Sequence, residues 1–228
     1  GTTPADAVDI LERYDLWDRM PESVRHYFRE TCRAGTDEDL PADARIRRYM
    51  MVRTRDIFEA AVARAKELGL TPLPLTTLLC GESREVGRTL VSIAREVVLS
   101  SHPVAAPCAI IASGETGVRL RREPVGEGGA NQELAAGACA DLALDAPVVV
   151  FAMDTDGSDG PTDIAGALTD GSTLGRARAT GVDLYRALNE HDVSRALRAA
   201  CDVVVTGPTG TNVNDIVIIV ILPPAAMP

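Results

Sequence analysis

The chain has 228 residues, of which 46% are hydrophobic and 25% charged, a composition ordinary for a globular protein with a sizeable core. Its formal net charge of −10 disfavours nucleic acids as partners, and its longest apolar run, residues 216–222, is far shorter than the roughly 20 residues needed to span a membrane. The five cysteines are scattered and never form a C-x-x-C pair, which argues against disulfide or zinc frameworks and predicts a reducing, cytoplasmic location.

Two helices are expected near the start of the chain. Thr3 can cap a helix whose first residue is Pro4, and a second helix is predicted to begin at Pro21. A polar link follows them. We therefore expect residues 1–40 to be a linker or the helical tail of a preceding domain, and residues 41–228 to form an α/β domain.

The pattern then alternates between strands and helices. Strands are predicted over residues 48–53, 73–79, 108–112, 148–152, 203–206 and 216–222, with 118–122 as a possible hairpin partner of 108–112. Helices are predicted over residues 56–68, 84–99, 131–144, 174–179, 184–190 and 193–200. Repeated strand–helix units predict a three-layer αβα sandwich with a mostly parallel sheet.

A small polar turn, residues 112–116, ends the predicted strand over residues 108–112. Glu115 in this turn could bind a metal ion or a substrate hydroxyl. A simple hairpin turn explains the same residues, and taken alone they favour that simpler interpretation.

A glycine-rich loop precedes the helix expected from residue 131. Glycines let the backbone approach a ligand, and the N–H groups of a helix N-terminus can bind phosphate. The loop is no Walker A motif, and Asn131 occupies the sixth place of the dinucleotide pattern G-x-G-x-x-G, so that pattern is incomplete. The candidate phosphate-binding residues are Gly128, Gly129, Asn131, Gln132 and Glu133. A flexible loop with an N-cap explains the sequence equally well.

The most informative segment is the acidic loop over residues 153–163. It follows an apolar run and combines four carboxylates with two glycines and a proline, which predicts a loop at the carboxyl end of a strand, where open α/β sheets bind ligands. Crowded carboxylates suit a divalent cation or proton transfer. Asp156 and Asp159 could hold Mg²⁺ or position a hydroxyl. Two tight turns with Asx caps are the alternative.

A second polar loop, residues 206–215, separates two apolar strands. It is longer than the two to five residues of a plain hairpin and is rich in hydroxyls, amides and glycines. Such a loop can present donors to a phosphate or a carboxylate, although an ordinary long turn is the alternative. The candidate ligand-binding residues are Thr206, Gly207, Thr209, Gly210, Thr211, Asn212, Asn214 and Asp215. We expect this loop and the acidic loop to meet at one rim of the sheet and bind an anionic small molecule together.

Three motifs together resemble the C-terminal domain of the glycerate 2-kinase family, called the MOFRL domain. They are Gly-Gly-Ala-Asn-Gln-Glu (128–133), Thr-Asp-Gly-Ser-Asp-Gly-Pro-Thr-Asp (155–163) and Thr-Gly-Pro-Thr-Gly-Thr-Asn-Val-Asn-Asp (206–215). Residues 81–86 and 113–116 also match that family. The chain differs from the family pattern at Ala130, where arginine is usual, at Asp154, where glycine is usual, and over residues 53–55 and 189–193.

This resemblance implies an ATP- and Mg²⁺-dependent transfer of phosphate to D-glycerate, which gives 2-phosphoglycerate. It implies two α/β domains around a cleft, and we expect the chain to be the C-terminal half, without the N-terminal domain that carries the nucleotide region and a functional lysine. Asp156, Asp159 and Asp192 are then the catalytic candidates, with Glu115 and Asp156 as metal ligands. Asp192 could instead simply cap a helix.

Two other functions fit the sequence. The altered positions allow a non-catalytic binding or regulatory domain of the same fold. Some family members carry an older label as hydroxypyruvate reductases, so NAD(P)H-dependent reduction of hydroxypyruvate is a third interpretation. The expected partners are a small hydroxy acid and the N-terminal domain, and the sequence also allows a homo-oligomer.

Overall fold

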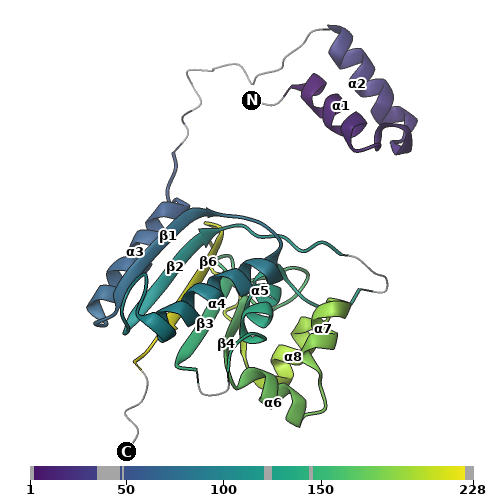
Figure 1. Cartoon of the computed structure of the whole chain (residues 1–228). Coiled ribbons are helices and arrows are strands. Elements are labelled where there is room, and N and C mark those ends of the chain that lie inside the picture. The colour runs from purple at the N-terminus through teal and green to yellow at the C-terminus, as the bar shows by residue number, and fades with distance from the viewer. Residues whose placement is uncertain (1–2, 35–46, 48, 121–124, 144–145, 224–228) are drawn as a thin grey trace, which may run out of the picture. The chain divides into compact units, whose positions relative to one another are not determined.

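We describe a computed structural model of the chain, in which residues 3–34, 47, 49–120, 125–143 and 146–223 are placed (Figure 1). Contacts divide the chain into two compact units, residues 1–50 and residues 51–228. None of the helices in the described ranges combines the length and the apolar character that crossing a membrane requires.

The first unit contains two helices and a short 3₁₀ turn. They are α1 (Pro4–Arg13), η1 (Trp17–Arg19) and α2 (Glu22–Ala34), which confirms both predicted helix starts to within one residue. The Thr3 hydroxyl accepts a hydrogen bond from the backbone N–H of Asp6 at 3.2 Å, and the Asp6 carboxylate accepts one from the Thr3 N–H at 2.7 Å. This reciprocal cap stabilises the first turn of α1. No residue of α1 is buried, and the proposed origin of residues 1–40 in a preceding domain stays a prediction.

The second unit is built on a six-stranded sheet of order β1-β2-β6-β3-β4-β5 (Figure 1). Its strands are β1 (Thr71–Leu79), β2 (Cys108–Gly114), β3 (Val148–Asp154), β4 (Gly166–Asp170), β5 (Val203–Val204) and β6 (Asp215–Ile221). Only β1 and β2 pair in parallel, and all other neighbours are antiparallel. The prediction of a mostly parallel sheet was therefore wrong. The reason is that β6 inserts between β2 and β3 in the opposite direction, and β4 and β5 complete an antiparallel edge.

Strand direction nevertheless gathers the loops at one edge of the sheet. The registers place the carboxyl ends of β1, β2, β3 and β5 beside the amino ends of β4 and β6. The segments that follow β2, follow β3 and precede β6 therefore emerge together. This edge is the one at which the sequence analysis expected a ligand.

Helices cover both faces of the sheet, which confirms the predicted αβα layers (Figure 1). On one face, α3 (Thr54–Glu67) packs Phe58 and Ala65 against alternate residues of β2, Ala109 and Ile111. Cys108, Ile110 and Ala112 of β2 face the larger core on the other side. That side carries α4 (Ser83–Ser100), α5 (Ala130–Cys139), α6 (Thr173–Ala179), α7 (Leu184–Glu190) and α8 (Val193–Ala200).

Several predicted elements need correction. Of the strand predicted over residues 48–53, residues 49–53 form no strand and residue 48 lies outside the described ranges. The side chains of Tyr49, Met50 and Met51 are mostly exposed, so they bury little apolar surface that would favour a strand. Residues 118–120 form no hairpin with β2, because β1 and β6 already pair with both of its sides; residues 121–122 lie outside the described ranges.

Two further differences concern lengths and omissions. The helix predicted over residues 131–144 ends at Cys139, and residue 144 lies outside the described ranges. Strand β4 was not predicted, because the sequence Gly-Ala-Leu-Thr-Asp over residues 166–170 lacks the β-branched, alternating pattern of a strand. Pairing with β3 stabilises β4 as a strand, although its local sequence does not favour one.

Helices α4 and α5 cross with their backbones in contact. A Cβ atom added to Gly87 of α4 would lie 2.1 Å from the carbonyl oxygen of Leu134, and one added to Gly137 of α5 would lie 2.6 Å from the carbonyl oxygen of Arg84. Both contacts are far closer than packed atoms allow. The two glycines thus hold α5, whose first turn faces the candidate site, tightly against α4.

We predict that Gly87→Ala destabilises the protein by about 1–3 kcal/mol, because the added methyl group must push the two helices apart. The matched control is Gly175→Ala in α6, where an added Cβ meets no atom within 4 Å. It should leave stability unchanged or raise it by up to about 1 kcal/mol through higher helix propensity. Urea unfolding of both variants measures the difference, and equal stabilities would show that the crossing tolerates side chains.

Candidate functional site

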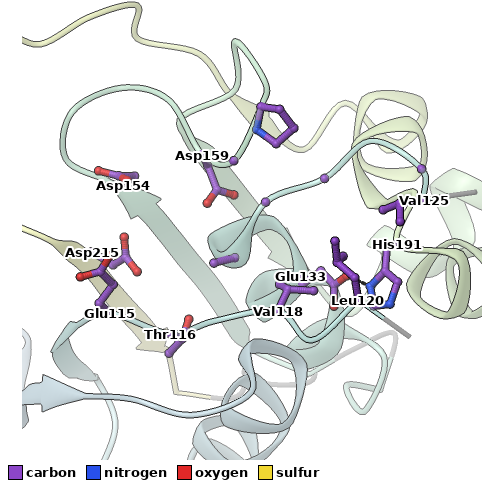
Figure 2. A pocket seen from close by; sticks show the side chains of 16 residues that line it. Glu115, Thr116, Val118, Leu120, Val125, Glu133, Asp154, Asp159, His191 and Asp215 are labelled. Atoms are coloured by element: carbon purple, nitrogen blue, oxygen red, sulfur yellow. Dashed lines mark hydrogen bonds and ion pairs between the residues drawn. The ribbon is translucent and has the colours of Figure 1, made fainter. Parts of the chain in front are cut away.

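A cavity of about 370 Å³ opens at the loop-bearing edge of the sheet (Figure 2). Five carboxylate side chains line it, and no lysine or arginine from the described ranges does. These five are Glu115, Glu133, Asp154, Asp159 and Asp215. Figure 2 shows Asp215, Glu115 and Thr116 on one side of the cavity and Glu133 with His191 on the other. Carboxylates therefore make up most of the ionisable groups that line the cavity.

The carboxylate of Asp159, in the acidic loop, caps the N-terminus of α5. It is 2% exposed, and its carboxylate accepts hydrogen bonds from the backbone N–H groups of Asn131 at 3.0 Å and Gln132 at 2.9 Å, and from both of their side-chain amides. Burial raises the pKa of Asp159, and these hydrogen bonds oppose that rise. The two N–H groups expected to face a phosphate are thus bonded to a carboxylate of the same chain.

The glycines of residues 126–129 fit this arrangement sterically. A Cβ on Gly129 would lie 2.2 Å from Oδ2 of Asp159, and one on Gly160 would lie 2.5 Å from the carbonyl oxygen of Gly128. Gly128 and Gly129 line the cavity. In this structure the glycine-rich loop therefore makes room for the acidic loop.

The side chains of Gln132 and Glu133 connect the first turn of α5 to residues elsewhere in the chain. The Gln132 side chain, which is fully buried, donates to Asp159 and accepts from the Ser194 hydroxyl at 2.6 Å. One carboxylate oxygen of Glu133 lies 2.7 Å from a guanidinium nitrogen of Arg84, and the other lies 2.6 Å from Nδ1 of His191. Sequence reasoning missed Arg84 and His191, because no local pattern links three positions so far apart in the chain.

Asp154 and Asp215 face each other on neighbouring strands, since the register of β3 with β6 pairs them directly. The pKa of Asp215 is raised to about 7, mainly by burial and also by the negative charges of Asp154 and Asp159, while a hydrogen bond from the Asn131 side chain opposes the shift. Burial likewise raises the pKa of Asp154, with Glu115 among the neighbours that add to the effect. Asp154 was not a predicted site residue, although the crowding of carboxylates in its loop was a signal for it.

The two polar loops meet at the same rim, as the sequence analysis predicted. The backbone N–H of Thr209 donates to the carbonyl oxygen of Asp156 at 3.0 Å, and the N–H of Val213 donates to the Thr155 hydroxyl at 2.8 Å. The Asn212 amide donates to the Asp156 carboxylate at 3.2 Å. Asp156 therefore joins the two loops, and its carboxylate is not among the groups that line the cavity.

The remaining predicted residues lie around the cavity or beyond it. Asp192 accepts a bond from the Glu127 N–H at 3.3 Å and pairs with Arg195 at 2.7 Å, and it does not line the cavity. Residues of the second loop other than Asp215 lie outside the cavity lining, and most of them are exposed to solvent. The exposed members are Thr206, Thr209, Gly210, Thr211 and Asn212, whereas Gly207 and Asn214 are half-buried.

Comparisons with known proteins agree with this geometry. A sequence model of the MOFRL family matches residues 108–215, a range that includes the whole acidic cavity edge from β2 to the first residue of β6. Residues 108–215 of the chain are a MOFRL family region.

The chain is similar to proteins about twice its length. It is 38% identical to the glycerate 2-kinase of Pyrococcus horikoshii and 37% identical to the D-glycerate 2-kinase of Thermotoga maritima, with 96% of the chain and 50% of each relative aligned. The crystal structure of the Thermotoga maritima glycerate kinase superposes with a TM-score of 0.77 and 37% identity, over 97% of this chain and 51% of that one. The chain thus spans about half the length of the curated relatives it matches.

We predict that Asp159→Asn lowers the free energy of unfolding by about 1–3 kcal/mol. Both carboxylate oxygens accept from N–H groups, so either orientation of the new amide sets a donor against a donor. Urea unfolding measures the effect. The control Asp163→Asn, whose side chain is 75% exposed and pairs only with Arg198 among the described residues, should cost under about 1 kcal/mol. Equal losses would contradict a structural role for Asp159 at the helix start.

The raised pKa of Asp215 predicts a pH-dependent effect of Asp215→Asn. The folded protein keeps this proton up to a pKa of about 7, whereas the ordinary value is 3.8, so the proton's stabilising contribution is complete below 3.8 and is lost as the pH rises through 7. The variant should gain about 1–2 kcal/mol relative to the parent between pH 5 and pH 8. Urea unfolding at both pH values, with a chelator present, measures the gain. Asp163→Asn should show a constant difference over that range, because the pKa of Asp163 lies below its ordinary value.

Proposed function

We propose that this chain is the C-terminal half of an ATP-dependent kinase that transfers phosphate to D-glycerate and forms 2-phosphoglycerate. The observation that carries the proposal is the junction of the acidic loop with the second polar loop beside one carboxylate-lined cavity. The similarity to two glycerate 2-kinases over nearly the whole chain supports it. Their names describe those longer proteins, so the reaction of this chain is inferred.

The charge of the cavity limits which reactants this half of the proposed kinase could bind by itself. D-glycerate and ATP are both anionic, so the ionised carboxylates of the lining repel them. The described lining includes no lysine or arginine, and of its five carboxylates Glu133 is paired with Arg84. Phosphoryl transfer depends mainly on positioning and on neutralising negative charge. We therefore infer that the other half of the protein supplies the cationic side chains, and that the chain alone does not catalyse the reaction.

The donor set of the cavity fits Mg²⁺. Mg²⁺ takes oxygen ligands and is usually held by one or two carboxylates together with water and substrate phosphates. Glu115, Asp154 and Asp215 offer such oxygens at the cavity. When bound, Mg²⁺ neutralises charge on the transferred phosphate. Of the two metal ligands expected from the sequence, Glu115 lines the cavity, whereas the Asp156 carboxylate does not line it and accepts hydrogen bonds from Ser158 and Asn212.

The protein's own groups have separate tasks in this proposal. Asp159 keeps the start of α5 and the glycine-rich loop in place. The exposed hydroxyls and N–H groups over residues 206–212 remain candidates for holding the carboxylate or phosphate of the substrate, because they stand at the rim without filling the cavity. Asp192 supports the wall through its contact with Glu127.

We expect the complete two-domain protein to phosphorylate D-glycerate with Mg-ATP and the 228-residue chain alone to show no turnover. In the complete protein, Glu115→Gln should lower kcat at least about 100-fold, because a carboxylate that lines the cavity is lost. Asp163→Asn, which changes an exposed carboxylate of the acidic loop, should stay within about twofold. A coupled assay for ADP measures both.

The same assay separates the alternatives. Binding of glycerate and Mg-ATP by calorimetry without ADP formation would replace the kinase with a binding domain. Oxidation of NADPH on addition of hydroxypyruvate, again without ADP formation, would replace it with a reductase.

A further inference from the structure

A second cavity, of about 360 Å³, lies between α4, α5 and α7 and shares no lining residue with the carboxylate-lined cavity. The beginning of α4, the C-terminal end of α5 and the exposed side of α7 contribute its walls. Its charged lining is balanced, because Arg84 and Arg88 stand against Glu85 and Asp141. The second cavity therefore differs in charge from the first, whose described lining has carboxylates and no arginine or lysine.

Each of these four side chains keeps an atom with which it can bind a ligand. Nε of Arg88 lies 2.9 Å from Oδ2 of Asp141, and Nη1 of Arg88 lies 3.4 Å from Oε2 of Glu85. Within the described ranges, Nη2 of Arg88 and the second oxygen of each carboxylate have no hydrogen-bond partner. The same holds for Nη1 of Arg84, which binds Glu133 through its other two nitrogens. Donors and acceptors thus remain available at one cavity.

Two helix ends add to this separation of charge. Arg84 and Glu85 belong to the first turn of α4, where the helix dipole favours a negative group. Ala140 is the C-cap of α5 and Asp141 follows it, so the carbonyl groups at this end favour a positive group. The second cavity therefore has one wall suited to an anion and another suited to a cation.

The part of the lining contributed by α7 is largely apolar. Leu188 is 7% exposed, and the ring of Tyr185 is half exposed beside it on the same helix. The Tyr185 hydroxyl donates to the carbonyl oxygen of Ala140 at 3.1 Å, which holds the ring against the end of α5. These side chains offer a surface on which a short apolar group can be buried.

We propose that the second cavity binds a small α-amino acid in its zwitterionic form. Arg84 and Arg88 bind the carboxylate of this ligand, and Asp141 binds its ammonium group. A ligand with negative charge alone is repelled by the two carboxylates of the lining, and one with positive charge alone is repelled by the two guanidinium groups. Only a ligand with both charges finds a partner for each.

Arg84 connects the second cavity to the first. One of its guanidinium nitrogens lies 2.7 Å from Oε2 of Glu133 and 3.1 Å from Nδ1 of His191, and both of these residues line the carboxylate-lined cavity. A carboxylate bound to Arg84 competes with Glu133 for the same guanidinium. Occupation of the second cavity therefore changes the surroundings of His191. This inference goes beyond the proposed kinase function and does not depend on it, because binding can be measured without turnover.

The test follows the histidine ring signals of the 228-residue chain by nuclear magnetic resonance during a titration with L-valine at constant pH. The signals of His191 should shift and saturate with a Kd of about 1 mM or tighter. His26 on α2 and His102 after α4 are exposed and serve as internal controls that should not shift. No change at His191 up to about 10 mM L-valine, or equal changes at all three rings, would overturn the proposal.

Two halves of the probe test whether both charges are needed. The acid 3-methylbutanoate lacks the ammonium group of L-valine, and 2-methylpropylamine lacks its carboxylate. At matched ionic strength each should bind at least about tenfold more weakly than L-valine, because one charge-assisted contact is lost. Binding of either compound as tight as that of L-valine would replace the amino-acid site with a site for a simple ion.

Variants locate the site. Arg88→Gln and Asp141→Asn should each weaken L-valine binding at least about tenfold. The control Arg186→Gln removes an exposed arginine of α7 that pairs with Glu190 and does not line the second cavity, and it should bind within about twofold of the parent. Unchanged binding in both lining variants, or an equal loss in the control, would contradict the assignment. The titrations of the parent chain decide the matter if a variant fails to fold. L-valine binding without glycerate phosphorylation by the complete protein would reject only the kinase.

Discussion

The insertion of β6 between β2 and β3 is the constraint on which the rest of this site depends. Because β6 runs against both neighbours, its first residue, Asp215, stands where β2 and β3 end. A carboxylate from the last strand of the sheet therefore meets Asp154 from the middle of the chain and Glu115 from the segment after β2. Backbone pairing, and not attraction between the side chains, holds these like charges together. Burial is the main cause of the raised pKa values of Asp154 and Asp215, and the neighbouring carboxylates add to the rise.

Two backbone N–H groups at the start of α5 have hydrogen-bond acceptors within the chain itself. The first turn of α5 has the glycines and free N–H groups typical of a phosphate site, yet Asp159 satisfies two of those N–H groups from within the chain. A carboxylate gains from the positive end of the helix dipole as a phosphate would. The same interaction fixes the acidic loop on α5, and α5 is fixed on α4 through two glycines. The cavity is thereby built on packed elements, which favours a stable geometry for whatever binds there.

The carboxylate lining of the cavity fits the proposal that a second domain completes this site. The chain aligns with about half of each glycerate kinase relative, and the described cavity offers oxygen ligands without cationic side chains. Two surfaces that meet at a cleft can divide the charges between them, with anionic groups on one wall and cationic groups on the other. Neither wall alone then attracts the complete set of reactants.

The sequence by itself determined the helices, five of the six strands, the αβα layers and the position of the loops that form the cavity, because these follow from local periodicity, capping and turn residues. It also indicated that residues near 156 and 210 would meet. Only the tertiary structure decided the antiparallel pairing, the existence of β4 and the exclusion of Asp156 from the cavity in favour of Asp154. Strand order and side-chain partners depend on contacts between residues far apart in the chain, such as Arg84 with Glu133 and Asn131 with Asp159. Local sequence patterns do not encode those contacts, because the packing of the completed sheet and helices determines which side chains meet.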